Sequence, residues 1–159
     1  MAHTIRPALV TDVPAILGFI RDLAAYEKLL HEVEATEDKL TATLFPAAGA
    51  PAAETLLAFE DGQPVGFALY FTTYSTFLGQ PGLHLEDLFV IPAARGRGIG
   101  KALLAQLARL SNERRYGRME WTVLDWNQPS IEFYQALGAA ILPDWKICRL
   151  TGAALARFA

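Results

Sequence analysis

The feature that most constrains the fold is a glycine-rich turn at residues 95–101, which reads Arg-Gly-Arg-Gly-Ile-Gly-Lys. An apolar run over residues 83–91 precedes it, and Pro92 ends that run because proline cannot donate to a strand ladder. Leucines at three- and four-residue steps follow the turn and indicate a helix with one buried face: Leu103, Leu104, Leu107 and Leu110. A strand, a tight loop and a helix are therefore expected in direct succession.

The N-terminal third predicts one strand and two helices. Residues 3–7 have the pattern of a short strand. Thr11 is expected to cap a helix that has Pro14 in its first turn, where proline is tolerated. Thr36 is expected to cap a second, shorter helix that runs to about Phe45.

A loop and a hairpin follow these helices. Residues 46–53 are rich in proline, alanine and glycine, which is typical of a loop. Two strand patterns, at residues 55–59 and 65–73, flank the dipeptide Asp61-Gly62, which favours a tight hairpin turn. We expect these strands to pair with each other in antiparallel fashion.

The C-terminal part alternates strand and helix patterns again. Residues 119–124 form an expected strand, Asn127 precedes a short helix, and Gly138 is placed to end that helix. Residues 145–150 form an expected last strand. The full order β-α-α-β-β-β-α-β-α-β over residues 1–159 predicts one α+β domain, with a mixed, mostly antiparallel central sheet flanked by helices.

The composition excludes several classes of function. The net charge of −3 disfavours nucleic-acid binding, even though arginines are present. Cys148 is the single cysteine, so no intrachain disulfide can form, and a reducing, cytoplasmic location is expected. No run of ~18 apolar residues and no opening leader pattern occurs, so no membrane partner is expected. His31 and His84 lack metal-ligand spacing and are interpreted as surface or strand histidines, so no metal is expected.

The glycine-rich turn has the chemistry of a phosphate site. A helix N-terminus presents unpaired N–H groups and a positive partial charge, and glycines let a backbone approach an anion closely. The spacing G-x-G-x-G departs from the dinucleotide pattern G-x-G-x-x-G, and Ala102 after Lys101 departs from the nucleotide P-loop. A tight turn without a ligand is the alternative interpretation of this loop.

The pattern Arg-x-x-Gly-x-Gly at residues 95–100 resembles the pyrophosphate-binding motif of the GNAT acetyltransferases. The resemblance covers nearly the whole chain and is greatest for the diamine (spermidine/spermine) N-acetyltransferase branch. It is carried by Ala-Tyr-Glu at residues 25–27, Leu-Glu-Asp-Leu-Phe-Val at residues 85–90, and Trp-Asn-Gln-Pro-Ser-Ile-Glu-Phe-Tyr at residues 126–134. It implies the GNAT acyl-CoA N-acyltransferase fold and direct acetyl transfer from acetyl-CoA to a primary amine. A catalytically silent acyl-CoA-binding sensor on the same fold is the alternative.

The resemblance also implies roles for individual residues. Tyr134 is the expected acid toward the coenzyme sulfur, although it could simply pack. Glu86 is the expected base, acting through water, and also a substrate ligand, whereas Asp87 is expected to be structural. Glu27 and Asp144 are further substrate candidates, because carboxylates suit a cationic amine. The expected coenzyme contacts are Leu88, Phe89, Val90, Arg95, Gly96, Arg97, Gly98, Ile99, Gly100, Lys101, Asn127 and Ser130, of which Asn127 is also a good helix cap.

One segment departs from the pattern of the polyamine enzymes. After the third strand those enzymes carry an acidic residue and a tryptophan, whereas residues 74–77 here read Tyr-Ser-Thr-Phe. The expected acceptor is therefore a small primary amine, which includes polyamines, diamines and thialysine-like amino acids. Relatives in this branch form homodimers that often exchange C-terminal strands, so a homodimer is expected, with residues 145–150 as the exchanged strand.

Overall fold

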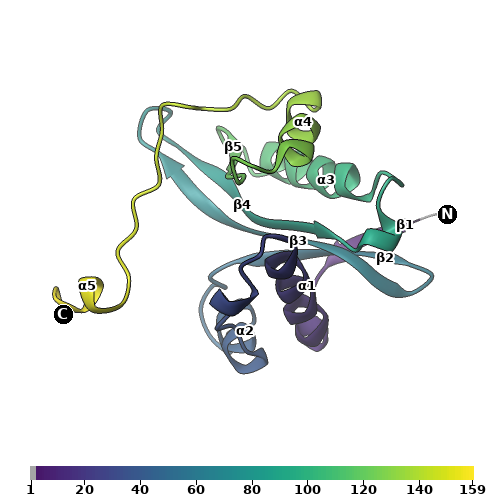
Figure 1. Cartoon of the computed structure of the whole chain (residues 1–159), viewed down its shortest axis with the longest axis horizontal. Coiled ribbons are helices and arrows are strands. Elements are labelled where there is room, and N and C mark those ends of the chain that lie inside the picture. Colours follow the sequence, from purple (N-terminus) through teal and green to yellow (C-terminus); the bar gives the residue numbers. More distant parts are fainter. Residues whose placement is uncertain (1–2) are drawn as a thin grey trace. The chain divides into compact units, whose positions relative to one another are not determined.

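The computed structural model describes residues 3–159 and divides into two compact units, Met1–Thr122 and Val123–Ala159 (Figure 1). The first unit contains a five-stranded sheet in the order β1-β2-β3-β4-β5. Its strands are β1 (His3–Pro7), β2 (Glu54–Glu60), β3 (Gln63–Ser75), β4 (Gln80–Val90) and β5 (Met119–Trp121). Neighbours pair antiparallel except β4 and β5, which are parallel, so the predicted mixed, mostly antiparallel sheet is confirmed.

Helices cover both faces of this sheet. Helices α1 (Val13–Tyr26) and α2 (Glu37–Leu44) lie on one face, and α3 (Ile99–Glu113) lies on the other (Figure 1). Under α1, Phe19 stacks on Phe67 of β3 with ring centroids 5.5 Å apart and tilts against Phe89 of β4 at 6.3 Å. Burial of each such ring contributes roughly 1.5–3 kcal/mol. This core fixes α1 against β3 and β4, where the site residues of the first unit lie.

The two helix caps predicted near the N-terminus have different outcomes. The Thr36 hydroxyl accepts a hydrogen bond from the Lys39 amide at 3.2 Å, which confirms the cap of α2. Thr11 does not cap α1, because it lies inside the 3-10 turn η1 (Val10–Asp12). Asp12 directly precedes α1 instead, and its carboxylate accepts the Leu9 amide at 2.7 Å and an ion pair from Arg6 at 2.7 Å.

The hairpin and the loop before it are as expected. Asp61 and Gly62 connect β2 to β3 and have φ values of 48° and 75°. Both values lie in the left-handed region that a tight hairpin turn requires. Residues 46–53 contain no helix or strand.

The β3–β4 pairing carries one irregularity, since Leu69 is opposite Asp87 whereas Tyr70 is opposite Leu85. Glu86 is therefore the extra residue of a β-bulge.

The second unit is built around the short helix α4 (Gln128–Ala136). The Asn127 side chain caps this helix by accepting the Ser130 amide at 3.4 Å. Gly138 has a φ of 93° and donates to the Gln135 carbonyl at 2.9 Å, which confirms its role in ending the helix. A further short helix, α5 (Gly152–Ala156), lies near the C-terminus.

Two strand predictions near the C-terminus need correction. Residues 145–150 form no strand, and Trp145 and Ile147 are 77% and 71% exposed. The strand predicted at residues 119–124 ends at Trp121 as β5. An apolar alternation becomes a strand only where another strand satisfies its backbone N–H and C=O groups. Residues 145–150 have no such partner in the described chain.

Candidate active site

The glycine-rich loop joins β4 to α3 as predicted. Gly96 and Gly98 have φ values of 76° and 81°, and Gly98 is the N-cap residue of α3. A Cβ at either position would meet nothing within 4 Å, so the left-handed backbone is what favours glycine there. Ile99 is buried and anchors the first turn of α3. The first N–H groups of a helix have no acceptor within it, so this turn offers donors to an anion.

The arginine side chains of the loop are held by groups of the first unit. Arg95 donates from Nε to the Val90 carbonyl at 2.8 Å, and its guanidinium lies 5.3 Å from the ring centroids of both Tyr26 and Phe89. Arg97 is paired with the buried carboxylate of Glu60 at 2.7 Å. The backbone and the helix N-terminus are therefore the groups through which this loop can hold a diphosphate, with exposed Lys101 beside them.

One edge of β4 is open next to this loop. Strand β4 pairs with β3 as far as Val90, whereas its pairing with β5 stops at Leu85 opposite Trp121. Among the described strands, residues 86–90 thus have a partner on one side only. The predicted coenzyme contacts Leu88 and Phe89 lie on this stretch, together with Val90. An extended ligand with amide groups can add to such an edge as a further strand would.

Several polar groups of β4 lie on the α1 face of the sheet. Phe67 and Leu69 belong to the core under α1, and Phe71 continues their alternation on the same face. Opposite Phe71 lies His84, with ring centroids 4.8 Å apart, and opposite Leu69 lies Asp87. Cross-strand partners share a face of the sheet, so His84 and Asp87 both face the α1 side.

Three carboxylates gather at the bulge. Burial, followed by the negative charges of Glu86 and Glu27, raises the pKa of Asp87 to about 6. Glu27, directly after α1, also has a pKa raised by burial. Glu86 is 55% exposed, and its Oε2 lies 3.5 Å from His84 Nε2. A group of carboxylates beside aromatic rings favours a cationic amine.

His84 was interpreted from the sequence as a surface or strand histidine, and it lies in β4. Asp87 was expected to be structural, whereas its place beside two other carboxylates also allows a part in substrate binding. Strand alternation predicts that adjacent residues face opposite sides, and the bulge at Glu86 interrupts that rule. The spacing of His84 two residues before Glu86 was the one available signal for their contact.

The predicted residues of the second unit lie on or after α4. Asn127 is buried at its start, Ser130 is in its first turn, and Tyr134 lies near its end with its ring 5.4 Å from that of Phe133. Asp144 is exposed and lies beyond α4, in a stretch without helix or strand.

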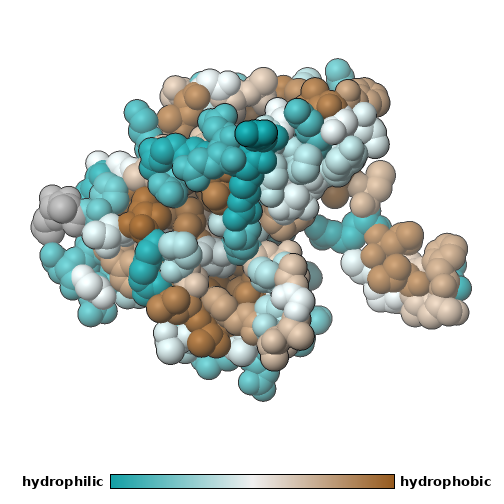
Figure 2. Space-filling view, turned by 180° about the vertical axis from the view of Figure 1, so that it is seen from behind, coloured by the Kyte–Doolittle hydropathy of each residue, from teal (hydrophilic) through white to brown (hydrophobic). Residues whose placement is uncertain are grey.

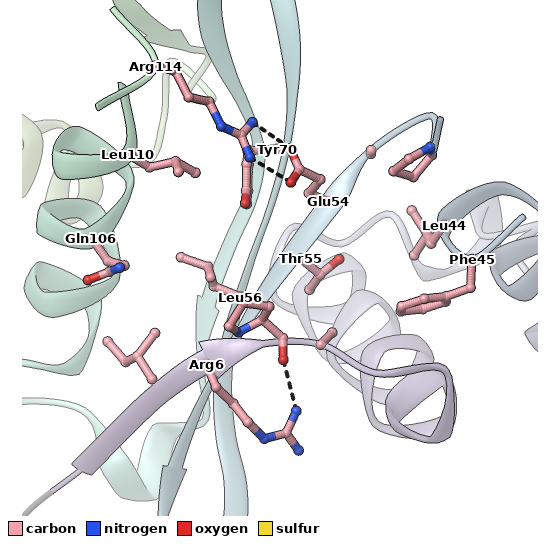
Figure 3. Close-up of a pocket in the computed structure, with 15 residues that line it drawn as sticks. Arg6, Leu44, Phe45, Glu54, Thr55, Leu56, Tyr70, Gln106, Leu110 and Arg114 are labelled. Carbon is pink, nitrogen blue, oxygen red and sulfur yellow. Dashed lines mark hydrogen bonds and ion pairs between the residues drawn. The ribbon is translucent and has the colours of Figure 1, made fainter. Parts of the chain in front are cut away.

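A separate hollow of about 370 Å³ lies at the β1–β2 side of the first unit (Figure 3). Arg114 donates two hydrogen bonds, of 2.6 and 2.8 Å, to the Glu54 carboxylate there. Burial, followed by the charge of Glu54, raises the pKa of the nearby Tyr70 to about 12. None of the predicted site residues lines this hollow.

Metal-ligand clusters and membrane-spanning helices are both absent from the described residues. In residues 3–159, no cluster of three or more His, Cys, Asp or Glu side chains could hold a metal ion. No helix within the described part of the chain is long and apolar enough to cross a membrane.

Comparison with known proteins identifies the family. Residues 20–139 match the Acetyltransferase (GNAT) family. The thialysine N-epsilon-acetyltransferase of Bos taurus is 37% identical over 98% of this chain and 96% of its own length. The L-ornithine N5-acetyltransferase NATA1 of Arabidopsis thaliana is 32% identical over 98% of this chain and 87% of its own.

A solved structure has the same fold. The integron cassette protein VCH_CASS6 from the mobile metagenome of V. cholerae superposes with a TM-score of 0.80 at 24% identity, over 99% of this chain and 98% of its own. With a family match over most of its length and relatives that are similar almost end to end, the chain belongs to the GNAT family and is an N-acetyltransferase.

Proposed function

We propose that this enzyme transfers the acetyl group of acetyl-CoA directly to a primary amine of a small cationic substrate. A polyamine, a diamine or a thialysine-like amino acid is the acceptor class. The gathering of Glu27, Glu86 and Asp87 on the α1 face of β4 is the observation that carries this proposal. Relatives named for thialysine and ornithine, both amines on short aliphatic chains, support the same class.

The binding of acetyl-CoA is proposed for the loop and the open edge of β4. The diphosphate would be held by the backbone at residues 96–101, with Arg95 and Lys101 flanking it. The amide groups of the pantetheine arm would pair with the backbone of Leu88, Phe89 and Val90 along the edge that β5 leaves open. Asn127 and Ser130 are the proposed contacts from the second unit. The left-handed glycines and the unpaired edge both fit this donor.

The proposed reaction needs one base and one acid. The amine loses a proton to Glu86 through a water molecule, and the raised pKa of Asp87 makes it a second acceptor near neutral pH. The amine nitrogen then forms a bond to the thioester carbonyl carbon, its second proton passes to Asp87, and the carbon–sulfur bond breaks. Tyr134 gives its phenolic proton to the departing thiolate and regains one from solvent. The backbone N–H groups of Leu88 and Phe89 are proposed to stabilise the carbonyl oxygen as it gains charge.

The acidic group at the bulge also favours turnover over silent coenzyme binding. A sensor that only binds acyl-CoA would need the glycine-rich loop and the open edge of β4 but no acidic group. Three carboxylates have a use when a cationic amine binds beside them. Asp87 interrupts a strand whose residues Leu85 and Phe89 are buried, and a desolvated carboxylate in such a place needs a ligand or partner.

A coenzyme-release assay over an amine panel tests the proposal. The panel holds spermidine, a short diamine, thialysine, ornithine, lysine and an aminoglycoside. We expect turnover with small aliphatic amines and a fall of kcat/KM of about 10²-fold in Glu86→Gln. Glu54→Gln is the matched control, because Glu54 lies on β2 rather than β4 and pairs with Arg114. Turnover only with a peptide N-terminus would contradict the proposed substrate class.

We also propose a homodimer in which residues 145–150 pair with a second copy. Trp145, Ile147 and Leu150 are exposed there without a strand partner. Apolar surface also covers α5 and the residues that follow it, where Leu155 and Phe158 are 56% and 78% exposed (Figure 2). Sedimentation of the wild type and of an Ile147→Lys variant tests this: we expect a dimer for the former and a shift toward monomer for the latter. A monomeric wild type at micromolar concentration would refute the dimer.

Two expectations about surroundings complete the proposal. Cys148 is exposed and in no disulfide, which supports a reducing, cytoplasmic location. The net charge of −3 supports the absence of a nucleic-acid partner.

A further inference from the structure

We propose that Glu60 and Arg97 form a latch that holds the glycine-rich loop in its coenzyme-binding shape, which makes Glu60 a positioning residue. This inference rests on the proposed binding of acetyl-CoA by the loop. Glu60 lies at the end of β2, far from the loop in sequence, and none of the site residues predicted from sequence includes it.

The latch is made by one guanidinium that bridges two parts of the first unit. Arg97 Nη1 donates to Glu60 Oε2 at 2.7 Å, and Arg97 Nη2 donates to the Ala93 carbonyl at 2.7 Å. Ala93 belongs to the 3-10 turn η3 (Pro92–Ala94), which opens the loop. The side chain therefore ties the middle of the loop both to its own start and to the sheet.

The position of Arg97 between two glycines makes such a tie necessary. Gly96 and Gly98 flank it with φ values of 76° and 81°. Glycine loses more backbone freedom on ordering than any other residue, so a segment with glycine on both sides is costly to hold in one shape. Two directed hydrogen bonds from the intervening residue restrict that freedom before a ligand arrives. Preorganisation of this kind increases affinity without any added contact to the ligand.

Glu60 is a rigid anchor for this purpose. Its side chain is 8% exposed, and its backbone pairs with His3 of β1 and Gln63 of β3. Its second oxygen, Oε1, is buried and accepts no hydrogen bond from the described residues. A buried carboxylate needs a cation, so Arg97 is tied to Glu60 by the cost of leaving that charge without a partner.

The direction in which Glu60→Gln changes the affinity for acetyl-CoA distinguishes the latch from a direct phosphate contact by Arg97. A carboxylate near a diphosphate repels it, so electrostatics alone predicts that Glu60→Gln tightens acetyl-CoA binding. Loss of the negative charge would also release Arg97 toward the ligand. The latch predicts the opposite, because the neutral amide holds the guanidinium less strongly and the loop loses its fixed shape.

The experiment is calorimetry with acetyl-CoA on five proteins: wild type, Glu60→Gln, Arg97→Gln, the double variant, and Glu54→Gln. Glu54 is the matched control, because it is a carboxylate of the same strand in a similar arginine pair but away from the loop (Figure 3). We expect each latch variant to raise the Kd about tenfold, the double variant to be no weaker than either, and the control to be unchanged. In steady state the KM for acetyl-CoA should rise while kcat and the amine KM stay the same.

Arg97→Lys is the second measurement, because it keeps the charge but loses the planar fork that reaches both acceptors. The latch predicts that it weakens binding nearly as much as Arg97→Gln, with folding of each variant checked by thermal unfolding. Tighter or unchanged binding in Glu60→Gln, or full affinity in Arg97→Lys, would overturn the latch. If the wild type itself does not bind acetyl-CoA, both the proposed coenzyme function and the latch are refuted. If the wild type binds normally and the variants bind equally well, only the latch is refuted.

Discussion

Asp87→Asn should make the protein more stable at neutral pH while impairing the enzyme. Burial, together with the charges of Glu86 and Glu27, raises the pKa of Asp87 from an ordinary 3.8 to about 6. A rise of that size corresponds to about 3 kcal/mol of destabilisation once the carboxyl is ionised. An amide of the same shape avoids this cost and relieves the repulsion of the two neighbouring carboxylates.

The pH dependence gives the sign of the effect. Between about pH 4 and pH 6 the folded chain binds more protons at Asp87 than the unfolded chain does, so this residue lowers stability as pH rises through that window. The stability that protonated Asp87 retains is fully present below its unfolded pKa and is lost as pH rises through its folded pKa. At pH 4 and below, wild type and Asp87→Asn should therefore be equally stable.

Urea unfolding of both proteins from pH 4 to pH 8 measures this difference directly. Taking the difference between the two curves cancels other groups, such as Asp12, whose pKa is lowered by its ion pair with Arg6. We expect the variant to gain up to about 3 kcal/mol by pH 8, with the gain developing between about pH 4 and pH 6. An equal or lower stability of Asp87→Asn at pH 8 would refute the account of a buried, repelled carboxylate.

Further substitutions test three separate features. Tyr134→Phe should lower kcat by about 10²-fold or more while acetyl-CoA binding is retained, and an unchanged kcat in single-turnover kinetics would remove Tyr134 from the reaction. Arg115→Gly should raise the unfolding free energy by about 1 kcal/mol, because Arg115 has a φ of 57° after α3; Arg109→Gly, inside the same helix, should lower it by about the same amount. Thr36→Ala should cost about 1 kcal/mol in chemical unfolding through loss of the α2 cap, and no loss would mean that the cap at 3.2 Å adds nothing.

Short-range features were predictable because they depend on neighbours in sequence. The turn at Asp61-Gly62, the Thr36 cap and the end of α4 at Gly138 each follow from the backbone preferences of one or two residues. The strand, loop and helix around residues 95–101 follow from the same kind of local signal. The Thr11 prediction failed by one residue, which is the usual uncertainty of a helix boundary.

Features that depend on strand pairing were not predictable in the same way. The bulge at Glu86 exists only in the register of β4 against β3, and it places His84 and Asp87, which are three residues apart, on the same face of the sheet. The expected strand at residues 145–150 lacks a pairing partner in the described chain, so its apolar alternation alone did not form one.

The sequence by itself therefore determined the family, the order of most elements and the glycine loop, since these rest on local pattern and on blocks of similar residues. The tertiary structure alone decided the environment of each charge. It placed Glu60 within 2.7 Å of Arg97 across 37 residues of chain, and it buried Asp87 among other carboxylates. Desolvation and charge–charge repulsion depend on distances in space, which is why a linear pattern identified the acidic residues but not their protonation.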